Sequence, residues 1–245
     1  MKISVLGASG RIGRLVISEA QRMGLIVTGM VSSKGDVEHL FLDTDVVIDF
    51  SSPSGTVDML AFSSRTESNI PLVIGTTGLG EVHDKLMQDV ARHTAIFYSP
   101  NMSIVVAIMN ELIKIATRML DTNEFDAEIF EAHHKGKRDA PSGTALMFGN
   151  TIATTRNQIF QEVAILDRAH HFRVRQPGEI GFASQRGGNI VGTHEVSFSG
   201  EFERLAIRHE ANSKELFARG AIRIATWLRN TTTNGLYTMS DYIRP

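Results

Sequence analysis

Apolar and polar positions divide the chain into two regions with different periodicities. In residues 1–102, short apolar runs alternate with segments in which apolar residues recur at helical spacing. Each run predicts a buried strand, and together the runs occupy residues 3–6, 25–31, 46–50, 71–75 and 95–99. Strands and helices that alternate in this way predict a doubly wound parallel sheet.

The rest of the chain predicts helices mixed with longer strands. A broad apolar face predicts a helix over residues 104–120, and further helices are expected at 145–155 and 214–228. Strands are expected at 126–133, 162–167, 180–186, 193–198 and 204–209, with a hairpin turn at 199–201. The fold class is therefore α/β. Residues 1–102 and 212–245 form a Rossmann-like domain to which the tail at 235–239 returns, and residues 103–211 form an α+β domain with one large open mixed sheet.

Composition limits the classes of partner. The chain has 245 residues, 25 basic and 27 acidic, with a formal charge of -2, so no global positive field argues for nucleic acid or an anionic membrane. The absence of cysteine excludes disulfides, thiolate metal sites and cysteine nucleophiles, and it is compatible with a reducing compartment. No apolar run reaches about 18 residues and no apolar leader follows Met1, so a cytoplasmic protein is expected.

A glycine-rich loop follows the first predicted strand. Its pattern over residues 7–13 is G-x-x-G-x-x-G rather than the commoner G-x-G-x-x-G, and such a loop can also be a simple turn. Its position at the first strand–helix junction favours dinucleotide binding, because the helix N-terminus there meets the charge of a pyrophosphate. The Gly-Thr-Thr-Gly sequence at 75–78 ends another strand, at the edge where such sheets bind ligands.

The segment after the second strand bears on nucleotide preference. Folds that bind NAD often place an acid there to hold the ribose 2′-OH, whereas this chain continues Val31-Ser32-Ser33-Lys34. Two hydroxyls and Lys34 would tolerate a 2′-phosphate, which favours NADP or the use of both nucleotides. Lys34 is equally well explained as a solvated loop residue.

A cationic cluster occupies residues 131–144. It combines the adjacent His133 and His134 with two lysines and an arginine, and then a Pro-Ser-Gly-Thr step that opens a helix. Imidazoles move protons near neutral pH, lysines hold negative charge, and a helix N-terminus offers N–H groups to a carboxylate or phosphate. A solvated basic loop is the alternative. A metal site is disfavoured, because no further ligand of convincing spacing accompanies Glu131 and the histidines.

Several stretches together resemble one enzyme family over essentially the whole chain. They are residues 7–13, 75–78, 186–196 and 217–221, and the cluster at 131–144 with its pattern E-A-H-H-x-x-K-x-D-A-P-S-G-T. In these stretches, and in their order, the chain is similar to 4-hydroxy-tetrahydrodipicolinate reductase, also called dihydrodipicolinate reductase. The resemblance implies an oxidoreductase that uses NADPH or NADH to reduce a cyclic unsaturated imine to tetrahydrodipicolinate in diaminopimelate and lysine biosynthesis.

The resemblance also implies roles for individual residues. His133 matches the proposed general acid, and Lys137 matches a residue that donates a hydrogen bond or proton and holds the dicarboxylate substrate. His134 matches a substrate contact, and Ser142, Gly143 and Thr144 match the cradle for a substrate carboxylate. Family members are typically homotetramers joined through the second domain's sheet. Together with Lys34, the candidate cofactor-binding residues are Gly7, Ala8, Gly10, Arg11, Ile12, Gly75, Thr76, Thr77, Ser99, Asn101 and Met102.

The chain departs from the family pattern in the adenosine region, and two other functions compete. The frequent acid after the second strand is missing and the next connection is short, so the resemblance does not fix NADH or NADPH preference. A semialdehyde dehydrogenase would share the nucleotide domain but usually needs a thiol nucleophile. A nicotinamide-sensing regulator has no reason to keep His133, Lys137 and the Ser142 cradle together, and no DNA-binding helix with a basic face is visible.

Overall fold

The chain divides into two compact units. A computed structural model describes residues 1–32, 35–170 and 172–243. The first unit comprises residues 1–104 and 214–245, and the second comprises residues 105–213. The first is an open parallel α/β sheet and the second a mixed sheet with helices, as the predicted fold class requires.

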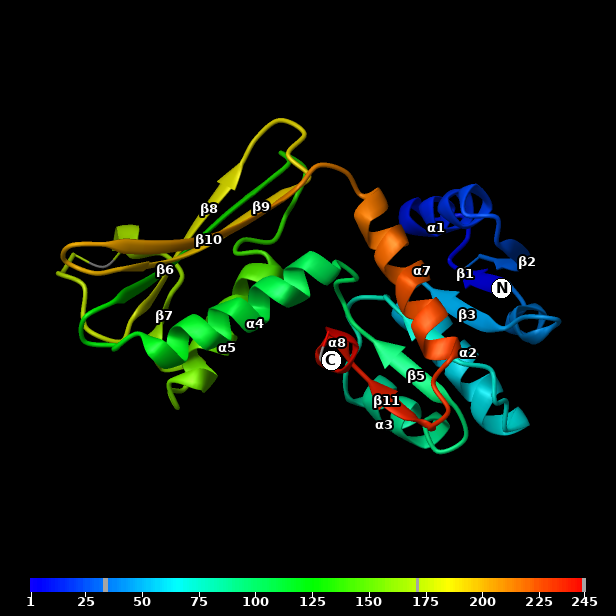
Figure 1. Ribbon diagram of the computed structural model, residues 1–245. Helices are drawn as coiled ribbons and strands as arrows, with labels where there is room; N and C mark the ends of the chain where they lie inside the picture. The colour runs from blue at the N-terminus through cyan, green and yellow to red at the C-terminus, as the bar shows by residue number, and fades with distance from the viewer. Residues whose placement is uncertain (33–34, 171, 244–245) are drawn as a thin grey trace. The chain divides into compact units, whose positions relative to one another are not determined.

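The first unit is built on a six-stranded parallel sheet in the order β11-β5-β4-β3-β1-β2 (Figure 1). The chain passes from β1 to β2 on one side and then to β3 on the other, so a crevice opens between the carboxyl ends of β1 and β3. The tail expected to return to this unit does so as the edge strand β11. The strands are β1 (Lys2–Leu6), β2 (Ile26–Val31), β3 (Val46–Asp49), β4 (Leu72–Ile74), β5 (Ala95–Tyr98) and β11 (Gly235–Tyr237).

Helices cover both faces of this sheet. In β3, Val46 and Ile48 face a core shared with α1 and α7, whereas Val47 faces a second core shared with α2 and α3. This period of two explains why the strands read as continuous apolar runs, since both faces are buried. The described helical segments are α1 (Arg11–Arg22), η1 (Val37–Phe41), α2 (Pro53–Thr66), α3 (Glu81–Val90), α7 (Glu215–Arg229) and α8 (Met239–Ile243).

The second unit is built on a five-stranded mixed sheet in the order β10-β9-β6-β8-β7. Its central strand β6 pairs antiparallel with β9 and parallel with β8. Residues of α4 (Ile104–Met119) and α5 (Gly143–Thr155) bury one face of the sheet, along which both helices run (Figure 1). The strands are β6 (Asp126–His133), β7 (Ala164–Ile165), β8 (Ile180–Arg186), β9 (Gly192–Ser199) and β10 (Arg204–Ala211).

The buried face of this sheet changes from apolar to polar between two neighbouring rows of residues. One row across the sheet consists of Phe182, Ile129, Val196 and Ile207, which belong to or pack against the core. The next row on the same face consists of Ser184, Glu131, His194 and His209. The apolar core therefore ends where the predicted cationic cluster begins.

One predicted strand is wrong in its first part. Glu162 and Val163, expected in a strand over residues 162–167, belong to the short helix α6 (Phe160–Val163), and β7 is only Ala164–Ile165. The chain then leaves the sheet, because the Asp167 carboxylate accepts the Ala169 N–H and starts a turn into η2 (Arg168–His170). Within the part of the chain that the structure describes, no helix is long and apolar enough to cross a membrane.

The apolar face of α4 extends beyond the part of the helix that packs against the core. Met109 and Ile113 are buried, as the helical pattern predicts, whereas Val105, Ile108 and Leu112 on the same predicted face are about half exposed. The pattern therefore identified the helix correctly but not the part of its surface that the second unit buries.

Candidate active site

The glycine loop lies at the carboxyl end of β1, in the crevice of the first unit. Gly7 has a φ of +82°, and a Cβ on it would collide with the Phe50 carbonyl at the end of β3. The N–H groups of Gly7 and Ala8 both donate to the Val31 carbonyl, at 2.8 and 3.0 Å. Gly10 is the N-cap of α1 and supplies no side-chain cap, so the helix N-terminus with Arg11 and Ile12 suits an anion supplied from outside the chain.

All but one of the other predicted cofactor residues follow β4 and β5 at the same edge of the sheet. Gly75 packs against the Phe50 ring so closely that a Cβ would collide with it. Thr76 is buried, whereas Thr77 is exposed. Ser99 donates to the Asn101 carbonyl at 2.7 Å, and the Met102 side chain is buried in the core. Lys34 lies outside the described residues.

Asp49 is a buried carboxyl beneath this edge that the sequence did not single out. It accepts hydrogen bonds from the Ser51 hydroxyl at 2.6 Å and from Thr56 in α2 at 2.5 Å. Burial raises the pKa of Asp49, and hydrogen bonds from Ser51, Thr56 and Thr76 oppose that rise. Because Thr76 Oγ1 also accepts the Ser51 N–H at 2.9 Å, Asp49 ties together the ends of β3 and β4 and the first turn of α2.

In the second unit, Glu131 is the centre of the predicted cluster. Its carboxylate is 1 % exposed and accepts two hydrogen bonds from the Arg186 guanidinium, at 2.7 and 2.9 Å. It also lies 2.6 Å from His133 Nδ1 and accepts the Ser142 N–H at 3.2 Å. Burial alone would raise the pKa of Glu131, but its hydrogen bonds and the charge of Arg186 lower the pKa to about 2. The carboxylate is therefore ionised at neutral pH.

His133 is held by this carboxylate at the end of β6. Burial lowers the pKa of His133, and the hydrogen bond and charge of Glu131 oppose that effect only in part. A neutral imidazole that donates its Nδ1 proton to Glu131 leaves Nε2 as a hydrogen-bond acceptor. His134 follows after the strand has ended, so the two histidines are not an equivalent pair.

Lys137 and Asp139 form an ion pair in the turn after β6. Lys137 Nζ lies 2.8 Å from Asp139 Oδ2, and the Lys137 N–H donates to the His134 carbonyl at 3.1 Å. Arg186 donates to the Asp139 carbonyl at 2.6 Å while it binds Glu131. One guanidinium therefore connects the buried carboxylate to the turn that carries Lys137.

Ser142 begins α5 and is almost fully buried. Its hydroxyl accepts the Ala145 N–H at 3.2 Å, as expected of a helix N-cap, and lies 2.9 Å from His194 Nε2. Gly143 is exposed, Thr144 is half-buried, and a Cβ on Gly143 would meet no atom of the described residues within 4 Å. Burial, together with the nearby His133, lowers the pKa of His194 to about 4. The structure thus brings His133, Lys137 and the α5 N-terminus into one hydrogen-bonded network.

Sequence reasoning missed Arg186 and His194 as site residues. Both lie in the 186–196 stretch that carried part of the resemblance, but neither has a local pattern that predicts contact with Glu131 or Ser142. Only strand register brings them there, since Arg186 is level with His133 and His194 is level with Glu131. Among the residues with described positions, no three His, Asp or Glu side chains are placed to hold a metal ion.

Comparison with known proteins decides the family. Models described as dihydrodipicolinate reductase, N-terminus and C-terminus, match residues 1–102 and 105–243. A curated relative from Campylobacter jejuni, named 4-hydroxy-tetrahydrodipicolinate reductase, is 42% identical over 247 residues that cover 99% of both chains. The chain belongs to the dihydrodipicolinate reductase family. A relative of the same name from Bartonella quintana is 35% identical, over 99% of this chain and 98% of its own.

Solved structures show the same fold. A dipicolinate-bound dihydrodipicolinate reductase from Paenisporosarcina sp. TG-14 has a TM-score of 0.76 at 20% identity, with 100% of this chain and 99% of that chain covered. A scyllo-inositol dehydrogenase from Lactobacillus casei with bound NAD(H) has a TM-score of 0.55 at 11% identity, over 98% and 92% of the two chains.

Membership of the family sets the general activity. The chain is an oxidoreductase of a family that carries out NAD(P)H-dependent reduction in diaminopimelate and lysine biosynthesis. The N-terminal domain of the family is a Rossmann-like nucleotide-binding domain, which agrees with the parallel sheet and glycine loop of the first unit.

The low pKa of His194 predicts an acid-dependent loss of stability. The folded state keeps His194 neutral down to about pH 4, whereas the unfolded state takes up a proton below about pH 6.5, so protons favour unfolding between these values. A shift of this size corresponds to roughly 3 kcal/mol. Urea unfolding of the wild type should therefore lose more stability than His194→Gln as the pH falls from 7 to 4.5. Parallel stability curves for the two proteins would contradict the buried, neutral state of His194.

Proposed function

We propose that the chain transfers hydride from NAD(P)H to the cyclic imine hydroxy-tetrahydrodipicolinate, with His133 and Lys137 supplying the proton. The observation that supports this most is the network around Glu131. One buried carboxylate fixes His133 and the start of α5 and, through Arg186, the turn that carries Lys137. A solvated basic loop needs none of these buried contacts.

The proposed proton donors follow from the chemistry of the reaction. Hydride addition to an unsaturated imine builds electron density that an acid must quench. His133 points one nitrogen at Glu131 and keeps Nε2 for the substrate, so it donates when Nε2 is protonated. Lys137 is the second proton donor, and its pairing with Asp139 sets where its ammonium lies.

A small dicarboxylate suits the charges of the cluster. The α5 N-terminus at Gly143 and Thr144 offers backbone N–H groups to one carboxylate, and Lys137 with His134 offers a site for the other. The relative from Paenisporosarcina, whose structure contains dipicolinate, supports a ligand of this class.

NADPH, NADH or both serve as cofactor in this proposal. Gly7, Ala8, Gly10, Arg11 and Ile12 follow β1 at the carboxyl edge of the first sheet, and the candidates Gly75, Thr76, Thr77, Ser99, Asn101 and Met102 follow β4 and β5. The glycine that opens the loop lets the backbone approach a pyrophosphate. With Val31 and Ser32 where an acid often stands, use of NADPH is expected alongside or in place of NADH.

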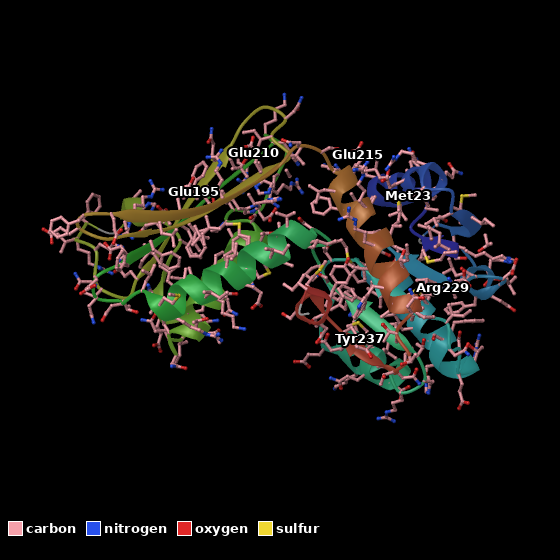
Figure 2. The ribbon with its side chains drawn as sticks, viewed as in Figure 1. Met23, Glu195, Glu210, Glu215, Arg229 and Tyr237 are labelled. Carbon is pink, nitrogen blue, oxygen red and sulfur yellow. The ribbon has the colours of Figure 1, made fainter. Side chains whose placement is uncertain are left out.

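A cytoplasmic homotetramer joined through the second unit's sheet completes the proposal. The face opposite α4 and α5 includes Ala206 of β10 and Glu195 of β9, and Glu195 is labelled in Figure 2. Glu195 pairs with Arg204 and Arg208. Arg208 also lies 3.2 Å from Glu210 on the same strand. A face that carries ion pairs and the small side chain of Ala206 suits contact with a second sheet.

The activity is tested with imine prepared freshly from pyruvate and aspartate semialdehyde by a working synthase. We expect the purified chain to oxidise NADPH or NADH only when the imine is present, as followed by nicotinamide absorbance with both cofactors in parallel. Oxidation in the absence of imine, or no turnover with either cofactor, would contradict the proposed reaction.

Substitution separates the two proposed proton donors. If protonated His133 is the donor, kcat/KM falls with rising pH at values below about 6.5, because burial keeps the His133 pKa below its usual value. His133→Gln should lower kcat and remove this pH dependence, whereas Lys137→Ala should lower both kcat and substrate affinity by about tenfold or more.

Lys135→Ala is the matched control, because Lys135 is an exposed lysine in the same turn. Its kinetics should resemble those of the wild type. Wild-type kinetics in both His133→Gln and Lys137→Ala would show that the pair does not supply the proton.

A further inference from the structure

Ser142 uses its polar groups inside the protein. Its N–H donates to Glu131 Oε1 at 3.2 Å, and its hydroxyl oxygen accepts the Ala145 N–H at 3.2 Å. The remaining short contact of the hydroxyl is with His194 Nε2, at 2.9 Å. Ser142 is only 2 % exposed, so its hydrogen bonds are made within the protein. These partners satisfy its backbone N–H and use its hydroxyl both as a donor and as an acceptor.

Counting the hydrogens decides the state of His194. If Nε2 accepts the Ser142 hydroxyl proton, His194 carries its own proton on Nδ1, which is buried and has no hydrogen-bond partner among the described residues. If Nε2 instead carried the proton, Nδ1 would still lack a partner and the Ser142 hydroxyl proton would lose its acceptor. The first tautomer leaves one buried polar group unsatisfied and the second leaves two, so the first is favoured.

Neighbouring rings fix the imidazole in this orientation. His133 lies edge-on at a centroid distance of 5.1 Å, and Phe148 of α5 lies edge-on at 6.0 Å. His194 is 5 % exposed and Phe148 is fully buried. The ring therefore sits between the apolar core and the predicted proton donor and has little freedom to turn.

We propose that His194 is a positioning residue for substrate binding, acting through Ser142. Neutral His194, protonated on Nδ1, accepts the Ser142 hydroxyl proton and so keeps the hydroxyl oxygen aimed at the Ala145 N–H. That contact caps α5 and orients the N–H groups of Gly143 and Thr144 towards a substrate carboxylate. Ser142 supports this cradle from behind and does not itself touch the substrate. The inference rests on the proposed function only where it names the ligand.

The tautomer is measured on the whole wild-type chain, labelled with ¹⁵N-histidine, by long-range proton–nitrogen correlation NMR at neutral pH. The resonance missing from His194→Gln identifies the residue. We expect the spectrum to show Nδ1 protonated and Nε2 unprotonated. A proton on Nε2, or a charged ring, would overturn the proposal whatever the enzyme reduces.

Binding is measured by calorimetry with dipicolinate and the same full-length chains. His194→Leu removes the acceptor and Ser142→Ala removes the cap, and each should weaken dipicolinate binding by about tenfold. The double variant should bind no more weakly than either single variant, because both changes break one connection. His194→Gln, whose side-chain oxygen can accept in place of Nε2, should recover most of the affinity.

Kinetics distinguish positioning from a general loss of structure. KM for the imine should rise in His194→Leu and Ser142→Ala, whereas kcat and the KM for NAD(P)H should stay close to wild-type values. His170→Gln, at an exposed histidine of the same unit, serves as the control and should leave all three unchanged.

Two results would refute the proposal. One is wild-type affinity for dipicolinate in a folded Ser142→Ala chain. This variant still tests the proposal if His194→Leu does not fold. The other is additive losses in the double variant. Failure of the wild type to bind dipicolinate or to reduce the imine would instead refute the proposed function, and the tautomer measurement would still decide the state of His194.

Discussion

The hydrogen bonds of one buried carboxylate, Glu131, hold the second unit's site together. A buried anion is costly unless it is fully paired, and here a guanidinium, an imidazole and a helix N-cap surround it. Each partner belongs to a different part of the fold: Arg186 to β8, His133 to the end of β6 and Ser142 to the start of α5. Satisfying the charge therefore also fixes the relative positions of these three elements.

The same sheet face serves the core and the site because its apolar rows end abruptly. Ile129 and Val196 pack beneath the helices, and the next residues on that face, Glu131 and His194, meet the N-terminus of α5 instead. Both of these polar side chains form hydrogen bonds with Ser142, the N-cap of α5. The first unit uses a comparable arrangement, in which buried Asp49 connects the ends of two parallel strands below the residues proposed to bind the cofactor.

The sequence predicted those features that depend on local pattern. Apolar and alternating runs located strands β1 to β6 and β8 to β10, the glycine loop located the β1–α1 junction, and residues 131–144 located the cationic turn. It could not predict that Arg186, 55 residues after Glu131, would pair with it, because parallel register across β6 and β8 depends on the whole fold. The first part of the strand expected at 162–167 was wrong because a short apolar segment fits a helical turn equally well.

The most direct test of this account compares dipicolinate binding to Glu131→Gln and to Glu128→Gln. Glu128 lies on the opposite face of the same strand and also pairs with arginines, so it controls for the loss of an ion pair. Calorimetry should show affinity lowered on the order of tenfold or more for Glu131→Gln and unchanged for Glu128→Gln. Wild-type affinity in a folded Glu131→Gln chain would contradict the claim that this carboxylate organises the site.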